Sequence, residues 1–178
     1  MITARKAVRE LEDALRRLAE RWHVPTTLAK FLVVGGLGYV IYQGMFYLLY
    51  DSPIFWFLPG KDTEAHLVVF THPDIRLLIA SVLGVETAIV FQFNAHERWT
   101  FRHRPRRGWI GARFVKFNLS SIVSPVIIVT TTNVLTPVFG LSPYVSNTVG
   151  VLLGFTWNWT LNTLVIWPHR HRISPEAG

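Results

Sequence analysis

Four long apolar segments constrain this chain more than any other feature of its sequence. They lie at residues 30–50, 75–97, 114–138 and 143–167, and each reaches the roughly 20 residues that a helix needs to cross a bilayer. Half of the 178 residues are hydrophobic and 16% are charged, whereas about a quarter of the residues in soluble domains are charged. The sequence therefore predicts an all-α integral membrane protein with four transmembrane helices.

The third segment is the most polar of the four. Its hydroxyl and amide residues are Asn118, Ser120, Ser121, Ser124, Thr130, Thr131, Thr132 and Asn133. Pro125 lies in the middle, and we expect it to break the helix. A polar, broken span is tolerated where neighbouring helices satisfy its backbone, so this segment is expected to face the helix bundle.

The distribution of Lys and Arg predicts the orientation. Sixteen of the eighteen lie near the termini or around the connection between the second and third segments, and only Lys61 and Arg76 lie elsewhere. Because Lys and Arg accumulate on the cytoplasmic side, we expect a multi-pass protein of the cytoplasmic (inner) membrane with both termini inside. The net charge of +7 follows from this asymmetry and indicates no nucleic-acid partner.

The first residues are charged and do not resemble a cleavable signal peptide. Apolar residues recur there at helical spacing, namely Val8, Leu11, Leu15, Leu18 and Trp22. This pattern predicts a cytoplasmic amphipathic helix on the inner membrane surface, while the mixed charges keep a partner-binding helix open as an alternative. The expected organisation is an amphipathic helix at 1–26, a membrane domain at 27–169 and a cytoplasmic tail at 170–178.

The second and fourth segments share a pattern at an offset of 66 residues. At their ends, Gln92 corresponds to Asn158 and His96 corresponds to Asn162. Before these residues, small side chains recur every fourth position, as Ala80, Gly84 and Ala88 and as Ser146, Gly150 and Gly154. Because small residues allow helices to approach closely, we expect the second and fourth segments to cross at these rows.

The first and third segments share a weaker pattern, since LAKF at 28–31 and GARF at 111–114 both place a cation and a Phe before an apolar run. The chain thus reads as two hairpin repeats. Each repeat begins and ends on the same side of the membrane, so their topology is parallel. Symmetry of this kind often locates a central site, but it can also reflect duplication with structural consequences alone.

These patterns resemble the GtrA-like family of small four-span membrane proteins over residues 28–168. The residues that carry the resemblance are Gln92-Phe93-x-x-His96-Glu97-Arg98-Trp99-x-Phe101 and Asn158-Trp159-x-x-Asn162-Thr163-x-Val165-x-Trp167. The family pattern reads Asn-Phe-x-x-Asn-Arg-x-Trp-x-Phe. Its basic residue is shifted to Arg98 in the first copy and absent from the second. The resemblance implies translocation of a polyprenyl-phosphate-linked monosaccharide to the outer leaflet for cell-surface polysaccharide synthesis. It also allows a non-transporting scaffold that recruits a glycosyltransferase.

Candidate binding residues follow from the chemistry of such a lipid. Its phosphate requires Arg or Lys at headgroup depth, and Arg98, Arg113 and Lys116 lie there. Its sugar requires amides and aromatic faces, and the candidates are Gln92, Asn94, His96, Trp157, Asn158 and Asn162. The alternative is that the cations hold ordinary lipid phosphates, which we favour for Arg102, Arg104, Arg106 and Arg107, and that the amides bond between helices.

Glu86 lies in the middle of the second segment, where an ionisable side chain is costly and faces protein or water. Three roles stay open: a protonated acid, a partner of a hydroxyl or amide in the third segment, or a proton-coupling group. Its counterpart in the repeat is Leu152. An acidic residue within a span also suggests small four-span multidrug exporters, but those chains are shorter and carry the acid in the first span.

The sequence offers little support for an enzyme. His96-Glu97 begins like a zinc-protease motif, but Thr100 stands where the second His is required. There is no Asp-x-Asp motif and no cysteine, and we expect neither a metal nor a cofactor. The expected partners are polyprenyl phosphate or its sugar-linked form, membrane lipids, a glycosyltransferase and, because four short helices enclose little volume, further copies of the chain.

Overall fold

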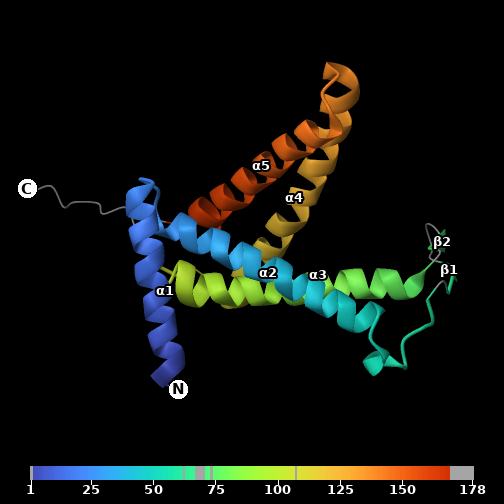
Figure 1. Ribbon diagram of the computed structural model, residues 1–178, viewed down its shortest axis with the longest axis horizontal. Helices are drawn as coiled ribbons and strands as arrows, with labels where there is room; N and C mark the ends of the chain where they lie inside the picture. Colours follow the sequence, from blue (N-terminus) through green and yellow to red (C-terminus); the bar gives the residue numbers. More distant parts are fainter. Residues whose placement is uncertain (1, 62, 67–70, 73, 107, 169–178) are drawn as a thin grey trace, which may run out of the picture. The chain divides into compact units, whose positions relative to one another are not determined.

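The computed structural model describes residues 2–61, 63–66, 71–72, 74–106 and 108–168, so Arg107 and the expected tail at 170–178 lie outside the described residues. Four helices are long and apolar enough to cross a membrane, which confirms the predicted all-α membrane class. The chain divides into two compact units, Met1–Thr100 and Phe101–Gly178. Each unit contains one helical hairpin (Figure 1).

The first unit contains a peripheral helix and a hairpin. Helix α1 (Ile2–Arg21) precedes α2 (Thr26–Tyr50), and α3 (Ile75–Ala95) returns beside α2 and continues into a π-helix, η2 (His96–Thr100). Helix α1 runs across the end of the hairpin where α2 begins (Figure 1). Its Leu15 and Ala19 side chains are buried, so part of the apolar stripe predicted for this helix packs against the protein.

The connection from α2 to α3 contains a 3-10 turn, η1 (Pro53–Phe55), and a short antiparallel pair of strands, β1 (Ala65–His66) and β2 (Thr71–His72). Lys61 and Arg76, the two cations that lie apart from the basic clusters, bind local acceptors in this region. Lys61 Nζ is 2.6 Å from Asp51 Oδ1, and Arg76 Nε donates to the Leu49 carbonyl at 3.0 Å. These contacts give both residues a local structural role at this end of the hairpin.

The second unit consists of α4 (Ile110–Phe139), α5 (Pro143–Leu161) and a second π-helix, η3 (Asn162–Ile166). Gly140 ends α4 in the left-handed conformation (φ 64°), and Ser142 caps α5. The expected helix break at Pro125 is wrong, because α4 continues through this residue. A proline removes one hydrogen bond of the helix, but Ser124 beside it donates to the Gly154 carbonyl of α5 at 2.9 Å and fixes the backbone there.

The small-residue rows pack within their own hairpins. A Cβ on Gly84 would lie 3.1 Å from the Tyr42 ring of α2, and a Cβ on Gly150 would lie 3.0 Å from the Cα and carbonyl oxygen of Ile128 in α4. The expectation that these two rows face each other is therefore corrected. Each row is covered by the preceding helix, because the missing side chains let the two helices of one hairpin approach closely.

The polar residues of α4 are used in two ways. Ser120 and Ser124 are buried and bond across to α5, as expected for a segment that faces other helices. Thr132 and Asn133 instead donate to carbonyls of their own helix, those of Ile128 and Val129. A back-bonded hydroxyl or amide needs no partner on another helix, so only part of this polar segment has to face the protein.

Candidate functional site

Both copies of the polar pattern end in a π-helix. The segments η2 and η3 begin at His96 and Asn162, which are the residues aligned by the offset of 66. A π-helical turn adds a residue to the helical repeat and redirects the side chains that follow, and such turns are frequent at functional sites. The two patterns therefore share a local backbone geometry as well as a residue pattern.

In the first unit, the pattern packs against the start of α2. The His96 ring stacks on Phe31 at a centroid distance of 4.6 Å, and its Nδ1 lies 3.0 Å from Thr100 Oγ1. His96 is only 2% exposed, so it is a buried packing residue in this structure. The two sequence patterns, the cation followed by Phe and the polar helix end, thus meet at one end of the hairpin.

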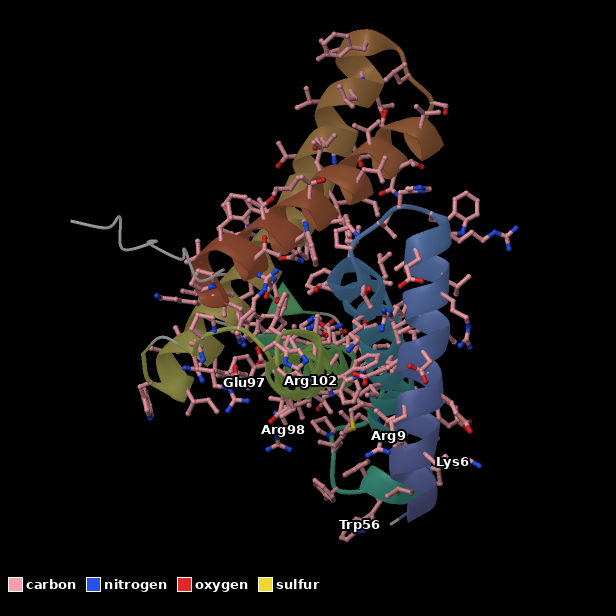
Figure 2. The ribbon with its side chains drawn as sticks, turned by 90° about the vertical axis from the view of Figure 1, so that its left-hand side faces the viewer. Lys6, Arg9, Trp56, Glu97, Arg98 and Arg102 are labelled. Carbon is pink, nitrogen blue, oxygen red and sulfur yellow. The ribbon has the colours of Figure 1, made fainter. Side chains whose placement is uncertain are left out.

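The other candidates of the first unit differ in exposure. The Gln92 side chain lies over Gly38 of α2, where any Cβ would overlap its amide. Asn94 Nδ2 donates to the Val90 carbonyl of its own helix at 2.8 Å. Arg98 is exposed and projects away from the ribbon (Figure 2), and of these residues it is the one best placed to reach a ligand.

A buried ion pair that the sequence analysis missed lies at the same end. Lys30 Nζ is 2.6 Å from Glu12 Oε1 of α1, and it lies 5.2 Å from the centre of the Trp99 ring. The Lys30 and Glu12 side chains are 11% and 17% exposed. The spacing of Glu12, Leu15 and Ala19 places them on one face of α1, and this was the available signal that Glu12 faces the protein.

In the second unit, amides connect α5 to α4. Asn158 Oδ1 accepts a hydrogen bond from Ser120 Oγ at 3.1 Å, and Asn162 Nδ2 donates to the Asn158 carbonyl at 2.6 Å. Asn162 is 1% exposed. Arg113 is also buried, and its Nη1 donates to the Gly108 carbonyl at 2.7 Å. Of these residues, Ser120 also lines the pocket described next.

A pocket of about 250 Å³ opens between α4 and the end of α5. It brings together two residues that were predicted from sequence, Lys116 and Trp157, and it includes Ser120, the partner of Asn158. The remaining lining residues are apolar: Leu119, Val123, Leu161, Val165 and Ile166. The pocket thus combines one cation and one aromatic face with a hydrocarbon surface.

Arg104 holds the end of the second hairpin, a role that the sequence did not indicate. Its Nη1 donates to the carbonyls of Thr163 and Trp167 at 3.1 and 2.7 Å, and its guanidinium lies 4.8 Å from the centre of the Phe101 ring. Phe101 stacks on Trp167 at 4.7 Å. Partial burial lowers the pKa of Arg104 from its ordinary value. A cation at the carboxyl end of a helix satisfies its last carbonyls.

Glu86 lies on α3 and is half-buried. The three roles considered for it stay predictions. Among the described residues, no group of three or more His, Cys, Asp or Glu side chains is arranged to hold a metal ion.

Both hairpins fall within the region matched by one known protein family. The family model described as "GtrA/DPMS, transmembrane domain" matches residues 30–167, and no curated protein matches the chain. The match starts at Lys30 and ends at Trp167, so it contains both hairpins and both π-helices, while α1 precedes it.

Proposed function

The chain belongs to the GtrA/DPMS transmembrane-domain family, and on that premise we propose that it binds a polyprenyl-phosphate-linked monosaccharide and moves it from the inner to the outer leaflet of the cytoplasmic membrane. Membership itself supports the broader role of a membrane protein in glycan or polyprenyl-linked sugar handling. The proposal places both termini in the cytoplasm and involves no change of covalent bonds by this chain.

The pocket between α4 and α5 is the observation that carries this proposal. A polyprenyl phosphate has an anionic group joined to a hydrocarbon tail, and the pocket offers Lys116 beside an apolar wall. Its volume of about 250 Å³ is below the roughly 300–1,000 Å³ of pockets that enclose whole ligands. It therefore suits the part of the lipid next to the phosphate, with the rest of the tail in the bilayer.

The other candidate residues take the roles that their exposure allows. In the second unit we assign the phosphate to Lys116, with Arg113 on the same helix as a further cation. In the first unit we propose Arg98 as a phosphate-binding residue in its own right. Trp157 offers an exposed face to a sugar ring, and Asn158 lies next to the pocket through Ser120. Gln92 and Asn94 are proposed as sugar-facing positions, whereas the buried His96 and Asn162 would face a sugar only if the packing around them opened. We also propose that the chain forms a homo-oligomer, which would extend the path that the pocket begins.

A second candidate function is a scaffold that recruits a polyprenyl-phosphate glycosyltransferase. The observation that favours it is the exposed apolar surface of α1, which includes Leu11 and Leu18 and continues into Trp22 just after the helix. Deletion of residues 1–24 separates the two functions. A scaffold loses its partner and its effect on glycan synthesis, whereas a translocating protein retains transfer.

The direct test is transfer between leaflets in liposomes. The full chain is reconstituted, a short-chain polyprenyl-phosphate monosaccharide is placed in one leaflet, and its arrival in the other leaflet is followed. We expect wild type and Lys61→Ala to transfer it, since Lys61 pairs with Asp51 at the other end of the first hairpin. We expect Lys116→Ala and Trp157→Ala to lose most transfer. Binding without transfer by the wild type favours the scaffold, and absence of binding overturns the proposed site.

A further inference from the structure

Lys30 and Trp99, which we call the Lys30 cluster, have the composition of an anion site. Lys30 lies near the start of α2, and its ammonium nitrogen lies 5.2 Å from the centre of the Trp99 ring. Within the described part of the chain, the buried indole Nε1 of Trp99 has no hydrogen-bond acceptor. In the same described range, no side chain caps the amino end of α2, and its first turn contains no acidic residue. The cation and the indole donor favour a negatively charged oxygen, and an uncapped helix amino end without acidic residues does not oppose one.

The negative charge at this place comes from outside the family domain. Glu12 Oε1 is 2.6 Å from Lys30 Nζ, and both side chains are largely buried. Lys30 is the first residue matched by the family model and Trp99 lies within the match, whereas Glu12 belongs to α1, which precedes it. The domain thus contributes the donors, and an additional helix contributes the anion. A buried ammonium that loses its partner is strongly unfavourable, so an anion that replaced the carboxylate would offset this cost when α1 moves away.

The attachment of α1 is limited enough to be reversible. Among the side chains of α1 that the structure describes, Leu15 and Ala19 are the buried apolar ones. Val8, Leu11 and Leu18 are exposed, as is Trp22 just after the helix. The link to α2 is short and bends at His23, which has a φ of 53°, in the left-handed region. An exchange of Glu12 for another anion therefore requires separation of a small contact at one end of the hairpin, with both helices of the hairpin intact.

We propose that Lys30 and Trp99 form a second phosphate site for the lipid-linked sugar, and that Glu12 occupies it as a built-in competitor when no lipid is bound. Helix α1 then acts as a reversible plug, whose residues Glu12, Leu15 and Ala19 cover the site. The inference rests on the proposed function for its ligand class. It differs from that function by placing a phosphate in the first unit and by making α1 its regulator.

The first test measures binding of farnesyl phosphate to the full chain in phosphatidylcholine nanodiscs, with farnesol as the uncharged control. Glu12→Gln removes the competing charge, so we expect its Kd to fall about tenfold below that of wild type. Glu10→Gln is the matched control, because Glu10 is exposed and its Oε1 lies 3.9 Å from Lys6 Nζ of the same helix. The Glu10→Gln variant should bind farnesyl phosphate with the same Kd as the wild type. Adding Lys30→Met to Glu12→Gln should abolish the gain.

The same measurements in a Lys116→Ala background isolate the new site from the pocket of the second unit. If the wild type binds farnesyl phosphate and Glu12→Gln binds it no more tightly, the plug is overturned and the proposed function is left intact. If no variant binds farnesyl phosphate even with Lys116 present, both proposals are overturned. If binding occurs with Lys116 present but every variant loses it in the Lys116→Ala background, the second site is overturned and the proposed function stands. Farnesol binding that follows the same pattern also overturns the plug, because an uncharged lipid does not compete with a carboxylate.

A second readout follows the plug while Glu12 and Lys30 are intact. The chain contains no cysteine, and Ala19 is a small buried residue of the α1 contact, so Ala19→Cys introduces a single, nearly isosteric reporter. We expect farnesyl phosphate to speed the reaction of this thiol with a maleimide several-fold, while Asp13→Cys, at an exposed position of α1, reacts at an unchanged rate. A rate for Ala19→Cys that stays constant or falls on adding farnesyl phosphate contradicts the displacement of α1.

Discussion

Two glycines of the helical hairpins differ in what a side chain would meet. A Cβ on Gly150 would lie 3.0 Å from backbone atoms of Ile128, which have little freedom to move, whereas a Cβ on Gly44 would have no atom within 4 Å. We expect Gly150→Ala to destabilise the second hairpin by about 1–3 kcal/mol through overpacking. Gly44→Ala should be neutral or slightly stabilising, because alanine favours the helix. Thermal unfolding in detergent measures both, and equal melting temperatures would contradict the close helix approach.

Arg104 and Arg102 are close in sequence but differ in their contacts. Arg104 donates to two carbonyls at the end of η3, while Arg102 is exposed and donates to its neighbour His103. A lysine at 104 keeps the charge but lacks the flat guanidinium that lies 4.8 Å from the Phe101 ring while its Nη1 reaches both carbonyls, so Arg104→Lys should cost about 1–2 kcal/mol. Arg102→Lys is the control and should change stability by less than about 0.5 kcal/mol. Denaturant unfolding tests this, and a similar loss in both variants would contradict the role of Arg104.

Helix α1 offers a prediction at the scale of one element. Leu11 and Leu18 are exposed on the apolar stripe, and exposed Lys6 and Arg9 lie on the same helix (Figure 2). Apolar side chains beside cations suit an interface with anionic lipid, and α1 crosses the end of its hairpin as an in-plane helix would. A nitroxide on Leu18→Cys should therefore be accessible to oxygen and shielded from a water-soluble nickel reagent. The same label on Asp13→Cys, on the opposite face, should show the reverse.

The outcome for α1 has two informative alternatives. If both labels are equally accessible to the nickel reagent, the helix does not contact the membrane. If the Leu18→Cys label is shielded from oxygen and nickel alike, a protein covers this face, which supports the scaffold function instead. Either result overturns the in-plane interpretation.

The elements themselves were largely predictable, because length and apolarity determine spans before any packing is known. All four predicted segments are helices, with bounds that differ by a few residues at their ends. The error at Pro125 arose because propensity treats a proline in isolation, whereas Ser124 and α5 fix the backbone around it. The small-residue rows identified close helix contacts but not their partner, since a stripe indicates only that some helix approaches.

The candidate site was predictable in residue type more than in arrangement. Lys116 and Trp157 line one pocket, where they supply the cation and the aromatic face expected of a binding site. His96 and Asn162, however, are buried in contacts within their own units. A polar residue at a helix end carries no sequence signal that distinguishes an exposed position from a buried one. The Lys30–Glu12 pair was missed because it joins two elements whose separate patterns gave no indication of a shared contact.

The orientation of the whole molecule is a prediction from charge alone, and it can be tested with two single cysteines. The basic residues cluster around the termini and the connection between α3 and α4, so this connection should be cytoplasmic and the connection between α2 and α3 external. Glu64→Cys and His103→Cys place exposed thiols on these two connections without changing the Lys and Arg distribution that determines orientation. In intact cells an impermeant maleimide should label Glu64→Cys fully and His103→Cys only after permeabilisation.

This orientation decides between mechanisms as well as topologies. The pocket with Lys116 and the cluster around Lys30 both lie at hairpin ends that the charge pattern assigns to the cytoplasm, where the lipid-linked sugar of our proposal would first meet the protein. Labelling of both cysteines in intact cells would indicate two orientations in the membrane. Labelling of His103→Cys alone would place both proposed phosphate sites outside. In that case an inner-leaflet lipid could not load them, and the proposed direction of transfer would have to be reversed.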